Sequence, residues 1–191
     1  TTSSAIAAFG RNPSTSYKTS AEEWIGAGAA VGAWSSGGNL NTGRRLGASA
    51  GIYNAGLTFG GDSDGTNGVA NTETYNGTNW TEVNDLNQAR QQLGGVGTST
   101  SSLAFAGRIA PNTAKTELWN GTNWTEVNDL NTAKYGVTGA GADNTAAICI
   151  GGYSTTYLTE TESWNGTNWT EVNNQNTARY GGGGSGTSTA A

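Results

Sequence analysis

The chain has 191 residues, of which 12% are charged, and it carries a formal net charge of −5 with no histidine. Few and scattered bases disfavour nucleic acid as a partner, because phosphate binding needs clustered Lys and Arg. Without histidine, Ser-His-Asp triads and most zinc sites are excluded, so we expect no enzyme, no metal and no cofactor. No apolar run approaches the roughly 18 residues of a membrane-spanning helix, so no membrane insertion is expected.

A unit of about 45 residues recurs along the chain. Each copy holds an apolar run ending in glycine, a Thr-Glu-x-aromatic step, a tryptophan and, ten residues later, a base. The first copy is degenerate, with its parts at residues 6–10, 21–24, 34 and 44. The next three share the segment Asn-Gly-Thr-Asn-Trp-Thr-Glu-Val-Asn without a difference, at residues 76–84, 120–128 and 165–173. Such a period indicates units that bury their faces by stacking on one another.

One full copy, residues 90–130, predicts four short strands. Residues 93–97 are Gly-rich, residues 103–107 are apolar, and residues 116–119 and 123–127 alternate. Segments at this spacing, separated by turn residues, are typical of a four-stranded antiparallel meander. The Asn-Gly step of the shared segment is a hairpin signal, because both residues tolerate positive φ.

The first strand of each unit is rich in glycine, as in residues 135–142 and 180–186. Glycine in a strand indicates close approach of another backbone, as at the narrow axis of a small propeller. Bulky side chains then belong in the outer part, where neighbouring blades diverge. We assign this structural role to Trp80, Trp124, Trp169, Tyr75, Trp119 and Trp164, with a sugar-stacking platform as the alternative for the tryptophans. The single cysteine, Cys149, is expected to be a small buried hydrophobe.

Kelch repeats combine a base that opens the first strand, a Gly-Gly pair that ends the second, an aromatic residue in the third and a Trp in the fourth. Here these places are taken by Arg179 and its equivalents, by Gly151 with Gly152, and by Trp164 and Trp169. The chain therefore resembles kelch-type β-propellers over nearly its whole length, with Ala106 as a departure from the Gly-Gly pair. The shared segment is also similar to kelch-like repeats in structural proteins of marine bacteriophages.

The resemblance implies an all-β fold, a β-propeller of four-stranded antiparallel kelch-like blades in one domain, residues 1–191. Three blades are expected to be continuous, at about residues 44–84, 90–128 and 134–173. A fourth, composite blade would combine residues 1–37 with residues 179–188, so that residues 180–186 pair with residues 5–10 and close the ring. A larger ring, or a last strand that completes a blade of a neighbouring molecule, are the alternatives.

The recurring bases Arg44, Arg90, Lys134 and Arg179 are expected to pair with carboxylates or carbonyls between blades. Glutamates also recur once per blade, at 73, 117 and 162 and at 82, 126 and 171. A residue that every blade repeats is better explained by blade construction than by one active site. This is a second reason to expect no enzyme.

The loops from the second to the third strand differ among the copies, and all would emerge on one face of the ring. Function often lies on variable loops held by a rigid scaffold, although such loops can also differ because nothing constrains them. Residues 62–68 place oxygens at alternate positions, and we interpret them as a plain turn, with a calcium loop as the alternative. The candidate binding residues on this face are Arg11, Tyr17, Asp62, Asp64, Arg108, Tyr153 and Tyr157.

These patterns and the resemblance favour a non-enzymatic structural and adhesive module of a virion appendage, of the tail or fibre type. It would lie at the virion surface or outside the cell and present its loops to a cell-surface glycan or to other virion proteins. A homo-oligomer is compatible with this interpretation. The alternative is a free secreted, glycan-binding, lectin-like propeller.

Overall fold

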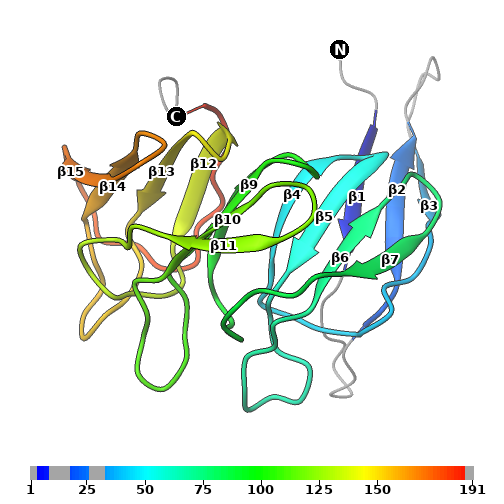
Figure 1. Ribbon diagram of the computed structural model, residues 1–191, viewed down its shortest axis with the longest axis horizontal. Coiled ribbons are helices and arrows are strands. Elements are labelled where there is room, and N and C mark those ends of the chain that lie inside the picture. Colours follow the sequence, from blue (N-terminus) through cyan, green and yellow to red (C-terminus); the bar gives the residue numbers. More distant parts are fainter. Residues whose placement is uncertain (1–3, 9–17, 26–32, 188–191) are drawn as a thin grey trace.

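The computed structural model describes residues 4–8, 18–25 and 33–187, which contain fifteen strands and no helix (Figure 1). The all-β prediction is therefore confirmed for this part of the chain. Three sheets have four antiparallel strands each, and neighbours in a sheet are neighbours in the sequence. These strands are β4 (Ala48–Ile52), β5 (Ala55–Phe59), β6 (Thr72–Tyr75) and β7 (Trp80–Val83); β8 (Gly94–Gly97), β9 (Ser102–Phe105), β10 (Thr116–Trp119) and β11 (Trp124–Val127); and β12 (Thr138–Asp143), β13 (Ala146–Ile150), β14 (Thr161–Trp164) and β15 (Trp169–Val172).

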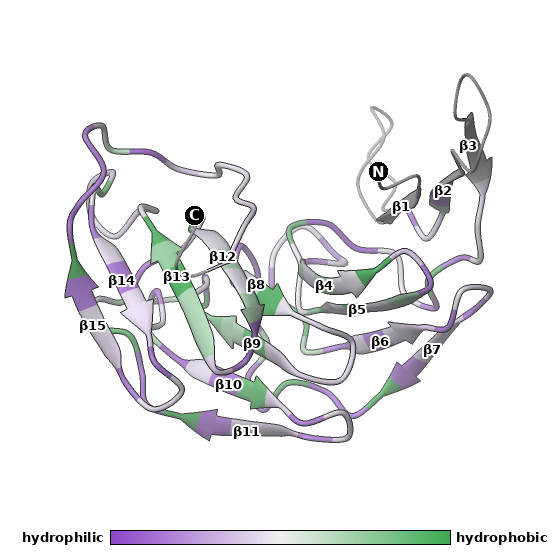
Figure 2. Ribbon diagram, turned by 90° about the horizontal axis from the view of Figure 1, so that it is seen from above, coloured by the Kyte–Doolittle hydropathy of each residue, from purple (hydrophilic) through white to green (hydrophobic). Residues whose placement is uncertain are grey.

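A further sheet has three strands, β1 (Ser4–Ala8), β2 (Ala21–Ile25) and β3 (Ala33–Ser36), in that order. Its register pairs Trp24 with Trp34, as Trp119 pairs with Trp124 in the complete sheets. The degenerate first copy of the repeat is thus built like the others but has no inner strand among the described residues. Viewed from above, the four sheets follow one another along an open arc, with β1–β3 at one end and β12–β15 at the other (Figure 2).

The predicted composite sheet is not formed, and this part of the prediction is wrong for the described residues. Residues 180–187 contain no strand, and the Gly181 N–H donates to the Gly136 carbonyl at 2.8 Å. The segment therefore lies beside β12 of its own sheet. It does not pair with β1, because the open arc places β1–β3 at its far end. Residues 9 and 10 of the expected partner strand lie outside the described residues.

Glycine lets the inner strands β4, β8 and β12 lie side by side. A Cβ atom added to Gly95 would lie 2.6 Å from the Phe59 ring and 2.8 Å from the Cβ of Ala48. A Cβ on Gly139 would meet Phe105 and Val96, both at 3.0 Å. The predicted close approach at the Gly-rich strands is thus confirmed, although Phe rings as well as backbone cause it.

The inner tryptophans are buried between sheets, with exposed fractions of 7% for Trp80, 5% for Trp124 and 6% for Trp169. Trp124 meets the ring of Phe59 edge to face at 4.8 Å and donates its indole N–H to the Thr72 hydroxyl at 3.0 Å. Both partners belong to the preceding sheet, whereas the period alone suggested packing on the following one. Since the indoles are covered, they cannot be a sugar-stacking platform.

The same arrangement recurs at Trp169, which meets Phe105 at 5.0 Å and donates to the Thr116 hydroxyl at 2.9 Å. The buried indole N–H of Trp80 has no partner among the described residues. In the later copies the acceptor is a threonine hydroxyl, and at the corresponding position of the first copy the chain has Ala21, which has no hydroxyl. The outer aromatic residues are buried as well: Tyr75, Trp119 and Trp164 are 3%, 0% and 1% exposed.

The invariant segment forms a turn and a clamp. The Asn120 side-chain carbonyl accepts the N–H groups of Thr122 and Asn123, both at 2.9 Å, and Gly121 has φ of 93°. The last residue of the preceding copy, Asn84, donates its amide to Asn123 at 2.7 Å and to the Thr122 carbonyl at 3.0 Å. Asn128 holds the turn of the third copy in the same way, so the first two copies each hold the turn of the next.

We expect Trp124→Ala to lower the free energy of unfolding by about 3–5 kcal/mol, because a large buried side chain leaves a cavity. Loss of the indole also leaves the Thr72 hydroxyl without its hydrogen-bond donor. Urea titration followed by circular dichroism measures the change. Ile52→Ala is the matched control, since Ile52 is 63% exposed and should change stability by less than about 0.5 kcal/mol. Equal effects of the two substitutions would contradict the packing.

Cys149 is fully buried in a cluster with Val96, Leu103 and Phe105, as the sequence predicts. Burial raises the pKa of its thiol to about 12, from an ordinary value of 9.0, and nearby Lys134 opposes the shift. The unfolded chain therefore loses this proton at a lower pH than the folded protein does.

The thiol should make the protein less stable as pH rises from about 9 to about 12, because only the unfolded state ionises in that window. Its contribution to the slope is at most about 1.4 kcal/mol per pH unit. Cys149→Ala removes this contribution, so its free energy of unfolding should approach that of the wild type as pH rises. Urea titrations at several pH values measure this. Parallel pH profiles of the two proteins would count against the assignment.

Candidate functional site

Each complete sheet carries the same short backbone bridge on the side of its variable loop. The residue after the recurring base faces the residue that directly follows the final glycine of the apolar run: Arg45 with Asp62, Gln91 with Arg108, and Tyr135 with Tyr153. In the third sheet the Tyr135 N–H donates to the Tyr153 carbonyl at 3.0 Å, and the Tyr153 N–H donates to the Tyr135 carbonyl at 2.8 Å. One backbone position thus presents three different pairs of side chains. Variation at a fixed position is what a binding surface on a repeated scaffold requires.

In the first sheet the bridge carries an ion pair, with Arg45 Nη2 at 3.0 Å from Asp62 Oδ2. The other oxygen of Asp62 accepts the N–H groups of Asp64 and Gly65, at 3.1 and 2.6 Å. Asp64 in turn accepts the N–H groups of Asn67 and Thr66, and these bonds lower the pKa of its carboxyl. Both carboxylates therefore build two consecutive turns.

The turn interpretation accounts for both of these acids. No group of three or more His, Cys, Asp and Glu side chains that could hold a metal ion occurs among the described residues.

In the third sheet the bridge carries tyrosines, which gather into a cluster. We name Tyr135, Tyr153, Tyr157 and Tyr180 the tyrosine cluster. Its ring centroids are 5.5 Å apart for Tyr135 and Tyr153, 5.4 Å for Tyr153 and Tyr157, 6.2 Å for Tyr157 and Tyr180, and 5.8 Å for Tyr180 and Tyr135. The four contacts close a cycle, with interplanar angles from 58° to 87°. Each ring therefore supports two others in tilted or edge-to-face contacts, which aromatic rings prefer.

Backbone constraints place these rings. Tyr153 follows Gly151 and Gly152, which have φ of 61° and 102°. The Tyr180 ring lies on Gly136, where an added Cβ would come within 2.2 Å of it. The Gln92 side-chain amide donates to the Tyr180 hydroxyl. Burial raises the pKa of Tyr180, and the adjacent Tyr135 adds to the shift, so this hydroxyl is protonated at neutral pH.

A cation completes the cluster on the side of the second sheet. The guanidinium carbon of Arg108 lies 5.6 Å from the centre of the Tyr135 ring, within cation–π range. The loops of the two sheets are also joined, since the Asn112 side-chain amide donates to the Ser154 carbonyl at 3.2 Å. Arg108 and Asn112 thus connect the tyrosine cluster and its loop to the second sheet.

The structure brings together three of the predicted binding residues, Arg108, Tyr153 and Tyr157, and places Asp62 and Asp64 apart from them, in the first sheet. Arg11 and Tyr17 lie outside the described residues. Sequence reasoning missed Tyr135 and Tyr180, which complete the cluster. Their signal was available: each directly follows a recurring base, the position that faces the variable loop.

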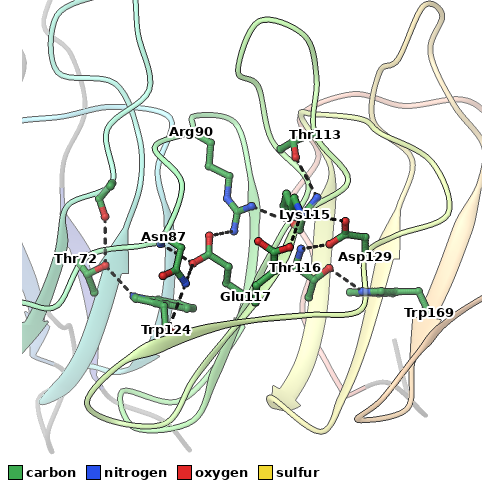
Figure 3. A network of polar contacts seen from close by, with 12 residues as sticks. Thr72, Asn87, Arg90, Thr113, Lys115, Thr116, Glu117, Trp124, Asp129 and Trp169 are labelled. Carbon is green, nitrogen blue, oxygen red and sulfur yellow. Dashed lines mark hydrogen bonds and ion pairs between the residues drawn. The ribbon is translucent and has the colours of Figure 1, made fainter.

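The recurring bases and acids form a buried network that organises the scaffold (Figure 3). Arg90 Nη2 lies 3.0 Å from Glu117 Oε1, and both side chains are buried. This nitrogen and this oxygen make no aligned hydrogen bond, so the contact is ionic. The other oxygen of Glu117 accepts the backbone and side-chain N–H groups of Asn87, at 2.7 and 2.8 Å. Burial lowers the pKa of Arg90, and the Glu117 carboxylate opposes the shift.

The same network recurs at Glu73, with Arg44 and Asn41, and at Glu162, with Lys134 and Asn131. The base pairs with an acid of the sheet that it opens, so the prediction of pairing between sheets is wrong for these three bases. The asparagine, from the linker that leaves the preceding sheet, makes the connection between sheets. These three glutamates are therefore part of the structural framework.

Comparisons with known proteins leave the family open: no family model matches the chain, and no curated protein is significantly similar to it. The described residues include no helix with the length and apolar character that crossing a bilayer would need.

We expect Glu117→Gln to destabilise the protein by about 3–5 kcal/mol, because it leaves the buried Arg90 charge without its counter-ion. Glu126→Gln is the control. Glu126 is 52% exposed and pairs with Lys115, so its loss should cost less than about 1 kcal/mol. Chemical denaturation of both variants measures the difference. A cost for Glu117→Gln as small as that of the control would refute the structural role of the buried pair.

Proposed function

We propose that this chain is a non-enzymatic structural and adhesive module, a β-propeller of kelch-like blades that binds a surface glycan through the tyrosine cluster. The exposure of the cluster carries the proposal, since Tyr157 and Tyr180 are 63% and 41% exposed. An exposed group of large apolar side chains is a feature of interaction sites, because a partner that covers them removes apolar surface from water.

The chemistry of the cluster suits a hydroxyl-rich sugar. A tyrosine ring offers a flat apolar surface for the C–H face of a pyranose, and its hydroxyl both donates and accepts hydrogen bonds. Arg108 adds a fork of N–H donors beside the rings. Because the rings support one another, little side-chain freedom is left to lose on binding, which favours affinity.

The propeller assignment rests on repetition. Three sheets share one topology, their inner strands lie side by side, and tryptophans fill the space between their outer parts. The similarity of the shared segment to repeats of bacteriophage structural proteins supports a place in a virion appendage, at the virion surface or outside the cell. Other virion proteins would then be further partners.

A free secreted lectin is the second candidate, favoured by the same tyrosine cluster. Sedimentation separates the two: an appendage protein stays with viral particles, whereas a secreted lectin stays in the supernatant.

A glycan array with the purified protein, followed by calorimetry on the best sugar, tests the binding site. Tyr157→Ala should weaken binding at least about tenfold, a loss of about 1.4 kcal/mol. Tyr53→Ala is the matched control, because Tyr53 is also exposed, at 43%, but lies outside the cluster, and its affinity should equal that of the wild type. Glycan binding that survives Tyr157→Ala, or an array without any bound sugar, would overturn the proposed site.

A further inference from the structure

The two ends of the arc carry the two halves of one junction. Inside the arc, every junction has the same parts: a linker with an asparagine and a base, and a glutamate of the sheet that follows. At the two junctions between complete sheets, an aromatic residue of the sheet before the junction is covered by a tryptophan of the sheet after it. These parts allow the same junction to be recognised where it is incomplete.

The linker after β15 repeats the linkers inside the arc. Its sequence Gln175-Asn176-Thr177-Ala178-Arg179 aligns with Leu130-Asn131-Thr132-Ala133-Lys134, with the same Asn-Thr-Ala step followed by a base. Its backbone has the same bonds: the Arg179 N–H donates to the Leu158 carbonyl at 3.2 Å, as the Lys134 N–H donates to Thr113 at 3.3 Å. The linker is thus folded as if a further sheet followed it.

The base of this linker has no acid beside it. Arg90 and Lys134 are completely buried against their glutamates, whereas Arg179 is exposed and forms no ion pair with any described residue. The face of the last sheet is also uncovered. Phe59 and Phe105 are fully buried under the next sheet, but Ile150, at the same repeat position, is half-buried.

A groove of about 300 Å³ opens on this face. It is lined by Thr138, Ala140, Ile150, Gln175, Arg179 and residues 182–185. In the internal junctions, the next sheet packs at the position where this groove lies.

The complementary half is the sheet β1–β3. Glu22 in β2 stands at the position of Glu73, Glu117 and Glu162, but it is exposed, and it has no ion pair with a described residue. No described residue forms the inner strand that each complete sheet has beside its second strand, so β1 is an open edge within the described part of the chain. Trp34, in β3, is at the repeat position of the tryptophans that cover Phe59 and Phe105.

We propose that the sheet β1–β3 of a second copy of this chain seats on the groove at β12–β15. Arg179 then pairs with Glu22 of the second copy, and residues 180–186 become the missing inner strand beside its β1. Reciprocal contacts join two copies into a closed ring of eight sheets, four from each, the upper end of the usual range for propellers. This assembly stands independently of the glycan proposal.

A second copy fits better than the chain's own first sheet. That sheet is already fixed at the opposite end of the arc, where the Tyr75 hydroxyl donates to Glu23 and Ala8 packs against the cluster that contains Tyr75 and Trp80. The new junction has one contact fewer than the internal ones, because the first copy lacks the Asn-Gly-Thr turn that Asn173 would hold.

The first measurement is the mass in solution by light scattering. The wild type, with a chain of 19.4 kDa, should have the mass of two copies, and Arg179→Glu should have the mass of one. Combining Arg179→Glu with Glu22→Arg in one chain should restore the mass of two. A wild type of one copy, or a mass that keeps rising with concentration, would overturn the two-copy ring.

The second measurement identifies the partner, in a Cys149→Ala background that removes the native thiol. Two single variants, Glu22→Cys and Arg179→Cys, are mixed and treated with a short bismaleimide. A cross-linked dimer supports the proposal, and the exposed Glu126→Cys mixed with Arg179→Cys is the control that should remain uncross-linked. Cross-linking only within a chain that carries both cysteines would mean that the chain closes on itself. Absence of both products would mean that another partner occupies the groove, and either result refutes the second copy.

Discussion

A buried carboxylate in the third strand of each complete sheet is the constraint on which the rest of the structure depends. Removing such a charge from water is costly unless a cation and hydrogen-bond donors surround it. Glu117 obtains the cation from Arg90 and the donors from Asn87. Both residues belong to one short linker, in which Asn87 and Arg90 lie four and seven residues after Val83, the last residue of β7. The linker can satisfy the carboxylate in only one position, so the two sheets that it joins are fixed relative to each other.

The invariant segment adds a second connection of the same kind at the outer edge. Asn84 holds the turn at residues 120–123, and Asn128 holds the turn at residues 165–168. The middle copy, residues 120–128, therefore both holds the turn of one neighbour and has its own turn held by the other. A substitution in the middle copy can therefore disturb two junctions.

The side chains of the variable loops take no part in these contacts, so their residue types are free to differ. The same backbone bridge carries an ion pair in the first sheet, a glutamine and an arginine in the second, and two tyrosines in the third. The scaffold thus keeps three equivalent positions at fixed places while their side chains vary. The tyrosine cluster arises because two neighbouring positions, at Tyr135 and Tyr180, happen to carry the same residue type.

The sequence by itself determined what repeats locally: the four-stranded meanders, the turn at Asn120 and Gly121, the close approach at the Gly-rich strands and the burial of Trp124. These depend on a few neighbouring residues and on the period, so a pattern in one copy is repeated in the next. Only the tertiary structure decided that Trp124 covers the preceding sheet, that Tyr180 reaches Tyr135, and that the arc stays open. The physical reason is that closure depends on the small rotation between successive sheets, summed over all of them, and no local pattern of residues encodes that sum.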